Sequence, residues 1–452
     1  MTVVKNPTAR LCEWVCETQF SDINAEVRGE ALTMLYDTIG GMIASAALPT
    51  CQPVVDMVKE MGGTQQCSIV GHPVKTSVLL AALANGTIGH GDEVDSTGQH
   101  GTGHFAAVMV PVAISVGQYA KVSGKELLRA LTLGSEVSAR INSILAEVFD
   151  HPRRHFTDSI GSIIGAAVLS GVLLKLNPTE MEHAIALAAS QASGINAIYY
   201  DPTHQSKSFQ YGNACRGGVM AALLAKRGFH GPPGILTLEH GFFDAFTGYA
   251  GFGKQVVDDL GKTYLMRQIA YKRFPVGGPN QTPLSIFLQL LKQHGLTADK
   301  IDQVEVTMSR GSFLTVATLK HPSVHLPTIL SMAAIFGELN FQHIHDSKYY
   351  EDPRVETFKE RVKLLPEPSK GSQGSRLEVT VRVRTRSGEV LNQAMRYPLM
   401  SKEELQGKFR FLAGLRLNKE KVLDLEKKLK NIESIDNVAP LFSELEIEYD
   451  AS

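Results

Sequence analysis

The densest group of reactive side chains lies in residues 85–104, NGTIGHGDEVDSTGQHGTGH, which we call the polar segment. It falls between two apolar stretches and contains imidazoles and carboxylates at His90, Asp92, Glu93, Asp95, His100 and His104. These are common general acids and bases of enzymes, and the glycines let the backbone approach a ligand closely. A solvated polar loop and a metal site are the alternatives. The segment has no H-E-x-x-H or comparably rigid ligand spacing, which favours acid/base chemistry over metal binding.

A second polar group occupies residues 150–158, DHPRRHFTD, before a small-residue helix that we expect to begin near Ser159. His155 and Arg153 or Arg154 would then lie near the helix N-terminus, where backbone N–H groups attract anions. A surface turn explains this pattern equally well.

The third and fourth polar groups each contain a lysine. Lys207, in HQSKSFQY, stands at the front of a mostly apolar helix, where a lysine usually extends to the surface. Lys272, in YKRFPVGGPN, lies in a Gly/Pro loop at an expected domain junction, and such junctions often line ligand clefts. Surface exposure of Lys272 and Arg273 explains this loop equally well. Spacing alone does not join the four groups.

The elements that must position these residues differ along the chain. Up to about residue 260 the hydrophobic spacing predicts helices at 28–42, 75–88, 106–119, from Gly124, at 180–191 with Thr179 as N-cap, and at 206–226. Several are rich in Ala and Gly and apolar all round, which predicts a closely packed helical core.

After about residue 265 the pattern changes. Alternating residues predict strands at 301–309 and 377–385, and a turn at 386–388 leads to a returning strand at 389–397. Helices are expected at 284–294 and 328–339, and a loop at 366–375. This predicts a smaller α+β unit with an antiparallel sheet. A capping box at Ser401 and Glu404 and an amphipathic helix at 419–432 indicate a helical tail that packs back onto the first domain.

Composition excludes several classes of protein. The 452 residues contain 45 Lys plus Arg and 46 Asp plus Glu, a net charge of −1, whereas nucleic-acid binders usually have a basic excess. Five cysteines, without metal-site spacing, argue against a disulfide framework or structural zinc. The sequence shows no secretory signal and no apolar run of about 18 residues. We therefore expect a cytoplasmic protein that binds neither nucleic acid nor membrane.

Four ordered stretches resemble the MmgE/PrpD family over nearly the whole chain. They are N85-G-x-x-x-H90-x-x-E93-x-D95-x-T97 followed by His104 and Pro111, R154-H155-F156 followed by G165-A-A, S206-K207-S-F-Q-Y-G-x-A-x-R-G-G, and Y271-K272-R-F-P. Two departures stand out. Glu93 and Ser96 replace aspartates of the usual H-x-x-D-x-D-D-T motif. The string K272-R-F-P-V-G277 resembles the K-R-F-P-x-H motif of cis-aconitate decarboxylases, but Gly277 occupies the position of its histidine.

The resemblance implies a mainly α fold, in which a large all-helical domain (residues 1–266 and 399–452) carries an inserted α+β lid domain (residues 267–398). It also implies a homodimer and a site between the domains that needs no metal or organic cofactor. The site positions that match the family motifs are Glu93, Asp95, Thr97, His104, His155, Lys207 and Lys272.

The family's reactions share one difficult step, which is making or quenching a carbanion next to a carboxylate. His104 would be the general acid/base, oriented by Glu93 or Asp95, while Lys207, Lys272 and His155 would neutralise substrate carboxylates. Thr97 and Tyr211 would help to bind substrate, and Lys272 and Tyr211 are candidates for the second acid or base.

We therefore predict a cofactor-independent lyase or isomerase acting on a small di- or tricarboxylate. Dehydration is favoured over epimerisation of an iminodisuccinate-like diacid, and Gly277 counts against cis-aconitate-type decarboxylation. A non-catalytic carboxylate-binding protein and a metal-dependent hydrolase are alternatives from other classes.

Overall fold

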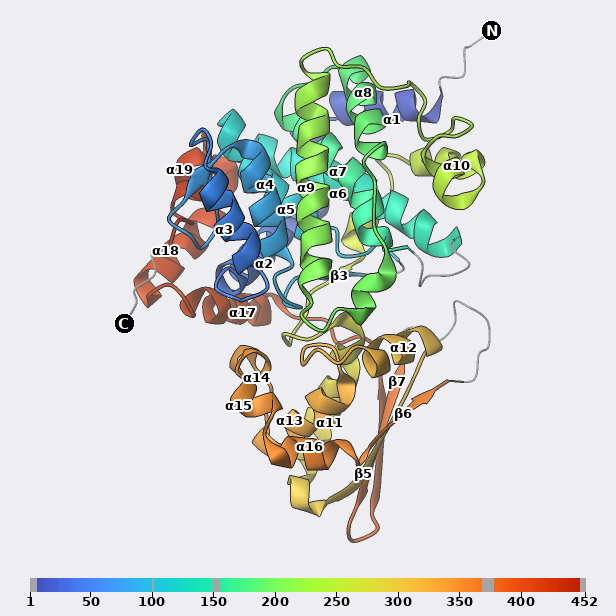
Figure 1. The fold of residues 1–452 in the computed structure, drawn as a ribbon, viewed down its shortest axis with the longest axis vertical. Coiled ribbons are helices and arrows are strands. Elements are labelled where there is room, and N and C mark those ends of the chain that lie inside the picture. Colours follow the sequence, from blue (N-terminus) through green and yellow to red (C-terminus); the bar gives the residue numbers. More distant parts are fainter. Residues whose placement is uncertain (1–5, 100, 149–154, 368–377, 448–452) are drawn as a thin grey trace.

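The computed structural model describes residues 6–99, 101–148, 155–367 and 378–447. It is mainly α, as the sequence predicts. Two large hydrophobic cores organise it: the upper, helical body in Figure 1 contains the first core, and the smaller lower body contains the second core, residues 276–391. Sequence expectations for His100, Arg153, Arg154, residue 377 and the loop residues 368–375 lie outside the described ranges.

Helices from the N-terminal half build most of the first core. They are α1 Pro7–Glu17, α2 Ala25–Ser45, α3 Gln52–Met61, α4 Val78–Gly89, α5 Ala106–Ala120, α6 Gly124–Val148, α7 Thr157–Leu173, α8 Pro178–Ala189, α9 Gln205–Ala225 and α10 Phe242–Thr247. Helices α5 and α7 are buried along almost their whole length, because their sequences are apolar on every side. None of the described helices combines the length and apolar character needed to cross a membrane.

Two helix starts differ from the sequence prediction. Asn177, not Thr179, caps α8: its side chain accepts from the Glu180 N–H, and the Glu180 carboxylate accepts from the Asn177 N–H. Both residue types cap helices well, and the helix tolerates Pro178 at its first position. The helix expected from residue 75 begins only at Val78, because Lys75–Thr76 forms strand β2 against β1, Cys67–Ser68.

The second core is a four-stranded sheet covered by helices. Its elements are α11 Gln281–His294, β5 Ile301–Met308, α12 Arg310–Thr318, α13 Leu326–Phe336, α14 Phe341–His345, α15 Ser347–Tyr350, α16 Pro353–Lys359, β6 Val362–Pro366, β7 Val379–Thr385 and β8 Val390–Met395. The predicted antiparallel pairing is confirmed for β5, β7 and β8. Strand β6 was not predicted from the sequence. It runs parallel to β5, because helices α12–α16 carry the chain back before the strand begins, so the sheet is mixed rather than antiparallel.

The C-terminal helices return to the first core. They are α17 Lys402–Gly414, α18 Lys419–Lys430 and α19 Ala439–Ser443, and Figure 1 shows them in red beside the blue N-terminal helices. The predicted capping box at Ser401 and Glu404 is confirmed. Phe409 of α17 stacks on Tyr36 of α2, so the tail is part of the first core. The exact domain bounds at 266/267 and 398/399 stay a proposal.

A two-residue ladder joins distant segments at the junction of the bodies. Strand β3, Thr97–Gly98, pairs with β4, Ile269–Ala270, and the Gln99 N–H donates to the Gln268 carbonyl at 2.7 Å. Short 3₁₀ helices complete the connections: η1 Phe20–Asp22, η2 Asn196–Tyr200, η3 Ala250–Val257, η4 Leu265–Arg267, η5 Gly278–Asn280, η6 Ala298–Lys300 and η7 Ile432–Ser434. The ladder places the end of the polar segment beside the residues that lead to Lys272.

The place of α17 in the first core can be tested with one substitution. Phe409 is 1% exposed, so Phe409→Ala should lower the free energy of unfolding by about 3–5 kcal/mol through lost burial and a cavity. Phe411 on the same helix is 48% exposed, and Phe411→Ala should change the free energy of unfolding by less than about 0.5 kcal/mol. Urea unfolding followed by circular dichroism measures both, and equal effects would contradict the assignment.

Candidate active site

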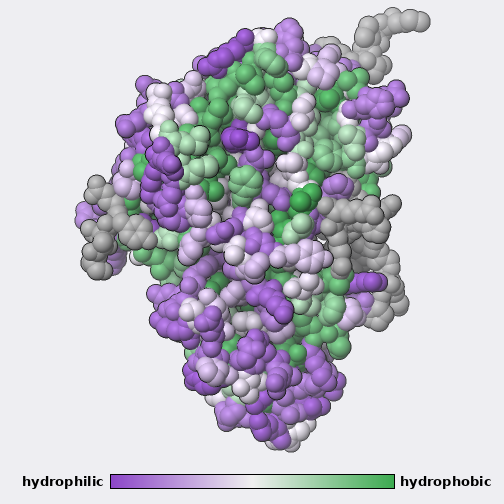
Figure 2. Space-filling view, viewed as in Figure 1, coloured by the Kyte–Doolittle hydropathy of each residue, from purple (hydrophilic) through white to green (hydrophobic). Residues whose placement is uncertain are grey.

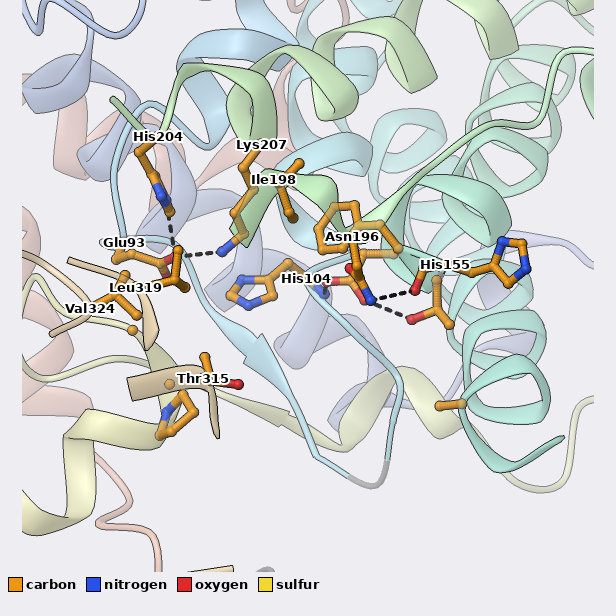
Figure 3. A pocket seen from close by; sticks show the side chains of 17 residues that line it. Glu93, His104, His155, Asn196, Ile198, His204, Lys207, Thr315, Leu319 and Val324 are labelled. Atoms are coloured by element: carbon orange, nitrogen blue, oxygen red, sulfur yellow. Dashed lines mark hydrogen bonds and ion pairs between the residues drawn. The ribbon is translucent and has the colours of Figure 1, made fainter. Parts of the chain in front are cut away.

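A cavity of about 300 Å³ lies where the two bodies meet, at the small end of the range for small-molecule pockets. Figure 3 shows its lining from close by. The upper body contributes several polar residues to the lining, among them Glu93, His104, Asp158, Asn196, His204 and Lys207. The lower body contributes the loop 277–279 and the mostly apolar side chains of Thr315, Leu319 and Val324. The cavity is therefore polar on one side and less polar on the other.

Glu93 is the centre of the polar side. Lys207 donates to its Oε1 atom, and Lys272 donates to Oε2 at 2.6 Å. The His204 Nε2 atom lies 3.2 Å from Oε1. Burial alone would raise the pKa of Glu93, but the charges of Lys207 and Lys272 outweigh burial and hold the pKa well below its usual value. Glu93 is thus a buried carboxylate that two ammonium groups keep ionised.

Asp95 joins this network to His104. Its Oδ2 atom lies 2.8 Å from His104 Nδ1, and its Oδ1 atom lies 3.2 Å from Lys272 Nζ. Burial opposes the ionisation of Asp95, yet the Lys272 charge holds its pKa well below the usual range. Burial lowers the pKa of His104, and Asp95 offsets this only in part. A neutral His104 with its proton on Nδ1 can accept a second proton at Nε2.

The backbone of His104 is fixed from behind by Asp158. Asp158 Oδ2 accepts from the His104 N–H at 3.0 Å and from the Tyr211 hydroxyl at 3.0 Å. Gly103 makes the approach possible: its φ is +75°, and a Cβ there would lie 2.3 Å from Asp158 Oδ1. Asp158 stands in the first turn of α7, where the helix dipole favours a carboxylate.

The crossing of α4 and α9 brings the remaining groups together. Gly86 and Gly212 meet there, because a Cβ on Gly86 would lie 2.8 Å from the Gly212 Cα. Helix α4 ends directly before His90, and α9 begins just before Lys207. His204, before α9, adopts a left-handed conformation with φ 61°, an uncommon backbone state. In Figure 3 its imidazole points at Glu93.

The structure brings together five of the residues selected from the sequence: Glu93, Asp95, His104, Lys207 and Lys272. They form one network of ion pairs, in which the two lysines contact the carboxylates themselves. Lys272 is fully buried in that network, with a side-chain exposure of 0%.

Three other selected residues lie around the network. Thr97 is beside Gly278, which lines the cavity. Tyr211 is buried behind His104 and reaches it through Asp158. His155 belongs to the lining, but Figure 3 shows its ring pointing away from Lys207 and His104. Its carbonyl accepts from the Asn196 side chain at 2.8 Å.

Several contacts in the site were not selected from the sequence. His90 Nδ1 lies 3.0 Å from Asp95 Oδ1. From the lower body, His345 Nε2 lies 2.8 Å from Asp92 Oδ2, and His321 stacks on His204 with centroids 5.1 Å apart. His90, Asp92 and His204 all stood within the polar groups, so their residue types were a usable signal. Nothing in the sequence links positions 321 and 345 to them.

Within the described ranges, two sets of side chains have ligand atoms close enough for a metal ion. They are His90, Asp95 and His104, and His90, Glu93 and His204. Both include a carboxylate that Lys272 contacts directly. A divalent cation at either place would be repelled by that ammonium group. The donor sets are therefore better matched to lysine than to a metal.

Comparison with known proteins identifies the family. Residues 9–255 match the MmgE/PrpD N-terminal domain, and residues 274–433 match the MmgE/PrpD C-terminal domain. The chain belongs to the MmgE/PrpD family.

Similar proteins include the cis-aconitate decarboxylase-like protein oryM of Aspergillus oryzae, 29% identical over 59% of this chain and 58% of that protein. Human cis-aconitate decarboxylase is 25% identical over 90% of this chain and 88% of its own length. The 2-methylcitrate dehydratase of Escherichia coli K12 is 25% identical over 57% of this chain and 54% of its own length.

The network makes stability depend on Lys272 and on pH. Lys272→Met leaves Glu93 and Asp95 buried without their shared cation, and it should cost roughly 3–5 kcal/mol at pH 7. The pKa values of both carboxylates are lowered in the folded state, so their stabilising contribution exists above their unfolded pKa values, near 4, and is lost as pH falls. The pKa of Lys272 is raised, so its contribution exists below about 10 and is lost as pH rises further.

Urea unfolding between pH 4 and 9 measures this effect. The stability deficit of Lys272→Met should be large at neutral pH and shrink toward pH 4, because Glu93 and Asp95 take up protons there in the variant, whereas Lys272 keeps them ionised in the wild type. Lys348→Met is the control, because Lys348 is an exposed partner of Asp346 and such pairs contribute about 0–1 kcal/mol. A pH-independent deficit in Lys272→Met would contradict the network.

Proposed function

We propose that this chain is a lyase of the MmgE/PrpD type that acts on a small di- or tricarboxylate, with dehydration as its reaction. The observation that carries the proposal is the orientation of His104. Asp95 holds its Nδ1 atom at 2.8 Å, and no hydrogen-bond partner of Nε2 occurs among the described residues. The imidazole lines the cavity next to Lys207.

The first step is removal of a proton from the carbon next to a substrate carboxylate. His104 Nε2 accepts this proton, and Asp95 stabilises the imidazolium that forms. The electron pair left on carbon spreads into the neighbouring carboxylate. Lys207 is the ammonium group of the described cavity lining, and it neutralises the added charge. One well-placed donor of this kind is worth roughly 3–4 kcal/mol in the transition state.

In the second step the hydroxyl on the adjacent carbon leaves, and the carbon–carbon double bond forms. The hydroxyl must be protonated to leave as water. Lys272 and Tyr211 are the two candidates from the sequence, and neither lines the cavity. Lys272 is buried within the network, and Tyr211 is buried behind His104. Lys207 is better placed to deliver this proton. His104 then returns the abstracted proton to solvent and Lys207 takes one up, which restores both groups for the next cycle.

Decarboxylation of a cis-aconitate-like acid is the second candidate reaction. The near full-length similarity to human cis-aconitate decarboxylase favours it, whereas similarity to the E. coli dehydratase covers about half of each chain. Gly277 argues for dehydration: it lines the cavity and supplies no imidazole there. Loss of carbon dioxide would leave a carbanion that needs a proton, and the loop at Gly277 offers no donor side chain for it.

Substitution of His104 tests the acid/base role. His104→Gln should lower kcat by about 10²- to 10⁴-fold, the usual contribution of a general base, with a small change in KM. The assay follows double-bond absorbance in a screen of citrate-like hydroxy acids, with carbon dioxide release and α-carbon deuterium exchange in parallel. His183→Ala is the control, because His183 stacks on His230 away from the site.

The outcomes separate the alternatives. Full activity in His104→Gln would remove the base assignment. Carbon dioxide release without dehydration of any hydroxy acid would indicate that the reaction is decarboxylation. Binding of acids without turnover or deuterium exchange would indicate a non-catalytic carboxylate-binding protein, and activity lost on chelation would indicate a metal-dependent enzyme. The absence of a cofactor and the cytoplasmic location expected from the sequence stay predictions.

We further propose a homodimer, as the family resemblance implies. Apolar side chains around η2 and the start of α9 support it: Ile195 is 61% exposed, Tyr200 82% and Phe209 48%. Hydrophobic residues also gather between hydrophilic ones over the upper part of the face in Figure 2, around α8 and α9. Exposed apolar patches often mark protein interfaces.

Light scattering during gel filtration tests the dimer. Wild type should elute at twice the chain mass, and Tyr200→Glu should shift the mass toward the monomer, because a charge in an apolar interface lacks a partner. Tyr249→Glu, at a similarly exposed tyrosine, should leave the mass unchanged. A wild-type monomer at micromolar concentration would contradict the proposal.

A further inference from the structure

Helix α17 contacts the catalytic network from outside the cavity. The Lys408 side chain is 9% exposed, and its Nζ atom donates to the Val94 carbonyl at 2.8 Å. The same atom lies 2.7 Å from Oδ1 of Asp37, a buried residue of α2. Val94 stands between Glu93 and Asp95. A single, largely buried ammonium group thus fixes the peptide that lies between the two carboxylates of the network.

Glu404, one turn earlier on α17, holds the other side of the network. Its two carboxylate oxygens accept from the Arg273 guanidinium at 2.5 and 3.0 Å, a geometry with high directional specificity. Arg273 follows Lys272 directly in the chain. Glu404 is itself oriented by the capping box with Ser401. One face of α17 therefore anchors residues next to Lys272 and residues next to its two carboxylate partners.

The Asp37–Lys408 pair is a poor choice for stability alone. Two charges lose their hydration there, and a pair of apolar residues would often do as well or better. Asp37 Oδ2 is buried and has no hydrogen-bond partner among the described residues. The pair is well matched to another task, because it supplies the Val94 carbonyl with a charged donor that a hydrophobic pair lacks.

We infer that Lys408 and Glu404 are positioning residues of the active site, which set the distance of Glu93 and Asp95 from Lys272 and so the orientation of His104. This inference rests on the proposed function for its catalytic consequence. Active sites tolerate displacements of only about half an ångström. A shift of the Val94 peptide moves Asp95 relative to His104 Nδ1, although neither Lys408 nor Glu404 lines the cavity.

The main test removes both buried charges together. Asp37→Leu with Lys408→Met avoids leaving one charge unpaired, so the double variant should fold and unfold cooperatively. Its kcat should fall by about 10- to 100-fold, the effect of a small misplacement, while KM changes little. Lys408→Arg keeps the charge and a donor and should retain most of the activity. Glu404→Gln should lower kcat less, and Glu403→Gln, on the same turn, is the matched control.

The second readout does not need turnover. It is the pKa of the His104 imidazole, followed by NMR titration and assigned with His104→Gln. Asp95 raises the pKa of His104, so a displaced Asp95 should let it fall, and the acid limb of the kcat/KM profile should move to lower pH. The other charged or titratable groups facing His104 are Asp158, His90, Tyr211, Lys207 and Lys272, and the double variant retains all of them.

The two readouts keep the proposals distinct. Unchanged kcat and unchanged His104 pKa in the double variant, even with reduced thermal stability, would show that the pair is only structural and would overturn the inference. If wild type turns over no acid but the His104 pKa falls in the double variant, the positioning role stands and the proposed function fails.

Discussion

The ammonium group of Lys272 lies between two buried carboxylates, and the rest of the site depends on this contact. It is 2.6 Å from Glu93 and 3.2 Å from Asp95. Without it, two negative charges would be buried near each other, and at least one would take up a proton. Asp95 would then lose the charge that orients His104. The cation therefore influences the pKa of His104, both directly and through Asp95, without a hydrogen bond to it.

Segments far apart in the sequence are brought together around this one contact. Glu93 and Asp95 follow α4, whereas Lys272 comes more than 170 residues later, after helices α1–α10 of the first core. The β3–β4 ladder sets the two segments side by side, and α17 returns from the C-terminus to contact both. Buried ion pairs seldom add net stability. Their geometry is better explained by the charge distribution that the cavity requires.

Sequence and structure agree where local chemistry decides the outcome. The helices around α5 and α7 and the strands β5, β7 and β8 follow from hydrophobic period, and the residues of the network follow from motif resemblance. The choice of helix cap and of strand partner was not predictable. Asn177 and Thr179 could each cap α8, and β6 lacks the alternating pattern by which the other strands were predicted. His345 reaches Asp92 only because the lower body packs against the first core, and no local pattern encodes that packing.

Glu93 illustrates how a departure from the family pattern acquires a physical meaning. By sequence, its additional methylene displaces the carboxylate by about 1.5 Å, one C–C bond, and puts its role in question. In the structure the two oxygens diverge toward different lysines, Oε1 to Lys207 and Oε2 to Lys272. An aspartate on the same backbone would hold this pair of oxygens about one C–C bond farther from the two lysines. The longer residue thus links the buried cation to the one that lines the cavity, and a substrate carboxylate that draws Lys207 away from Glu93 would change the charge balance at Lys272 and, through Asp95, at His104.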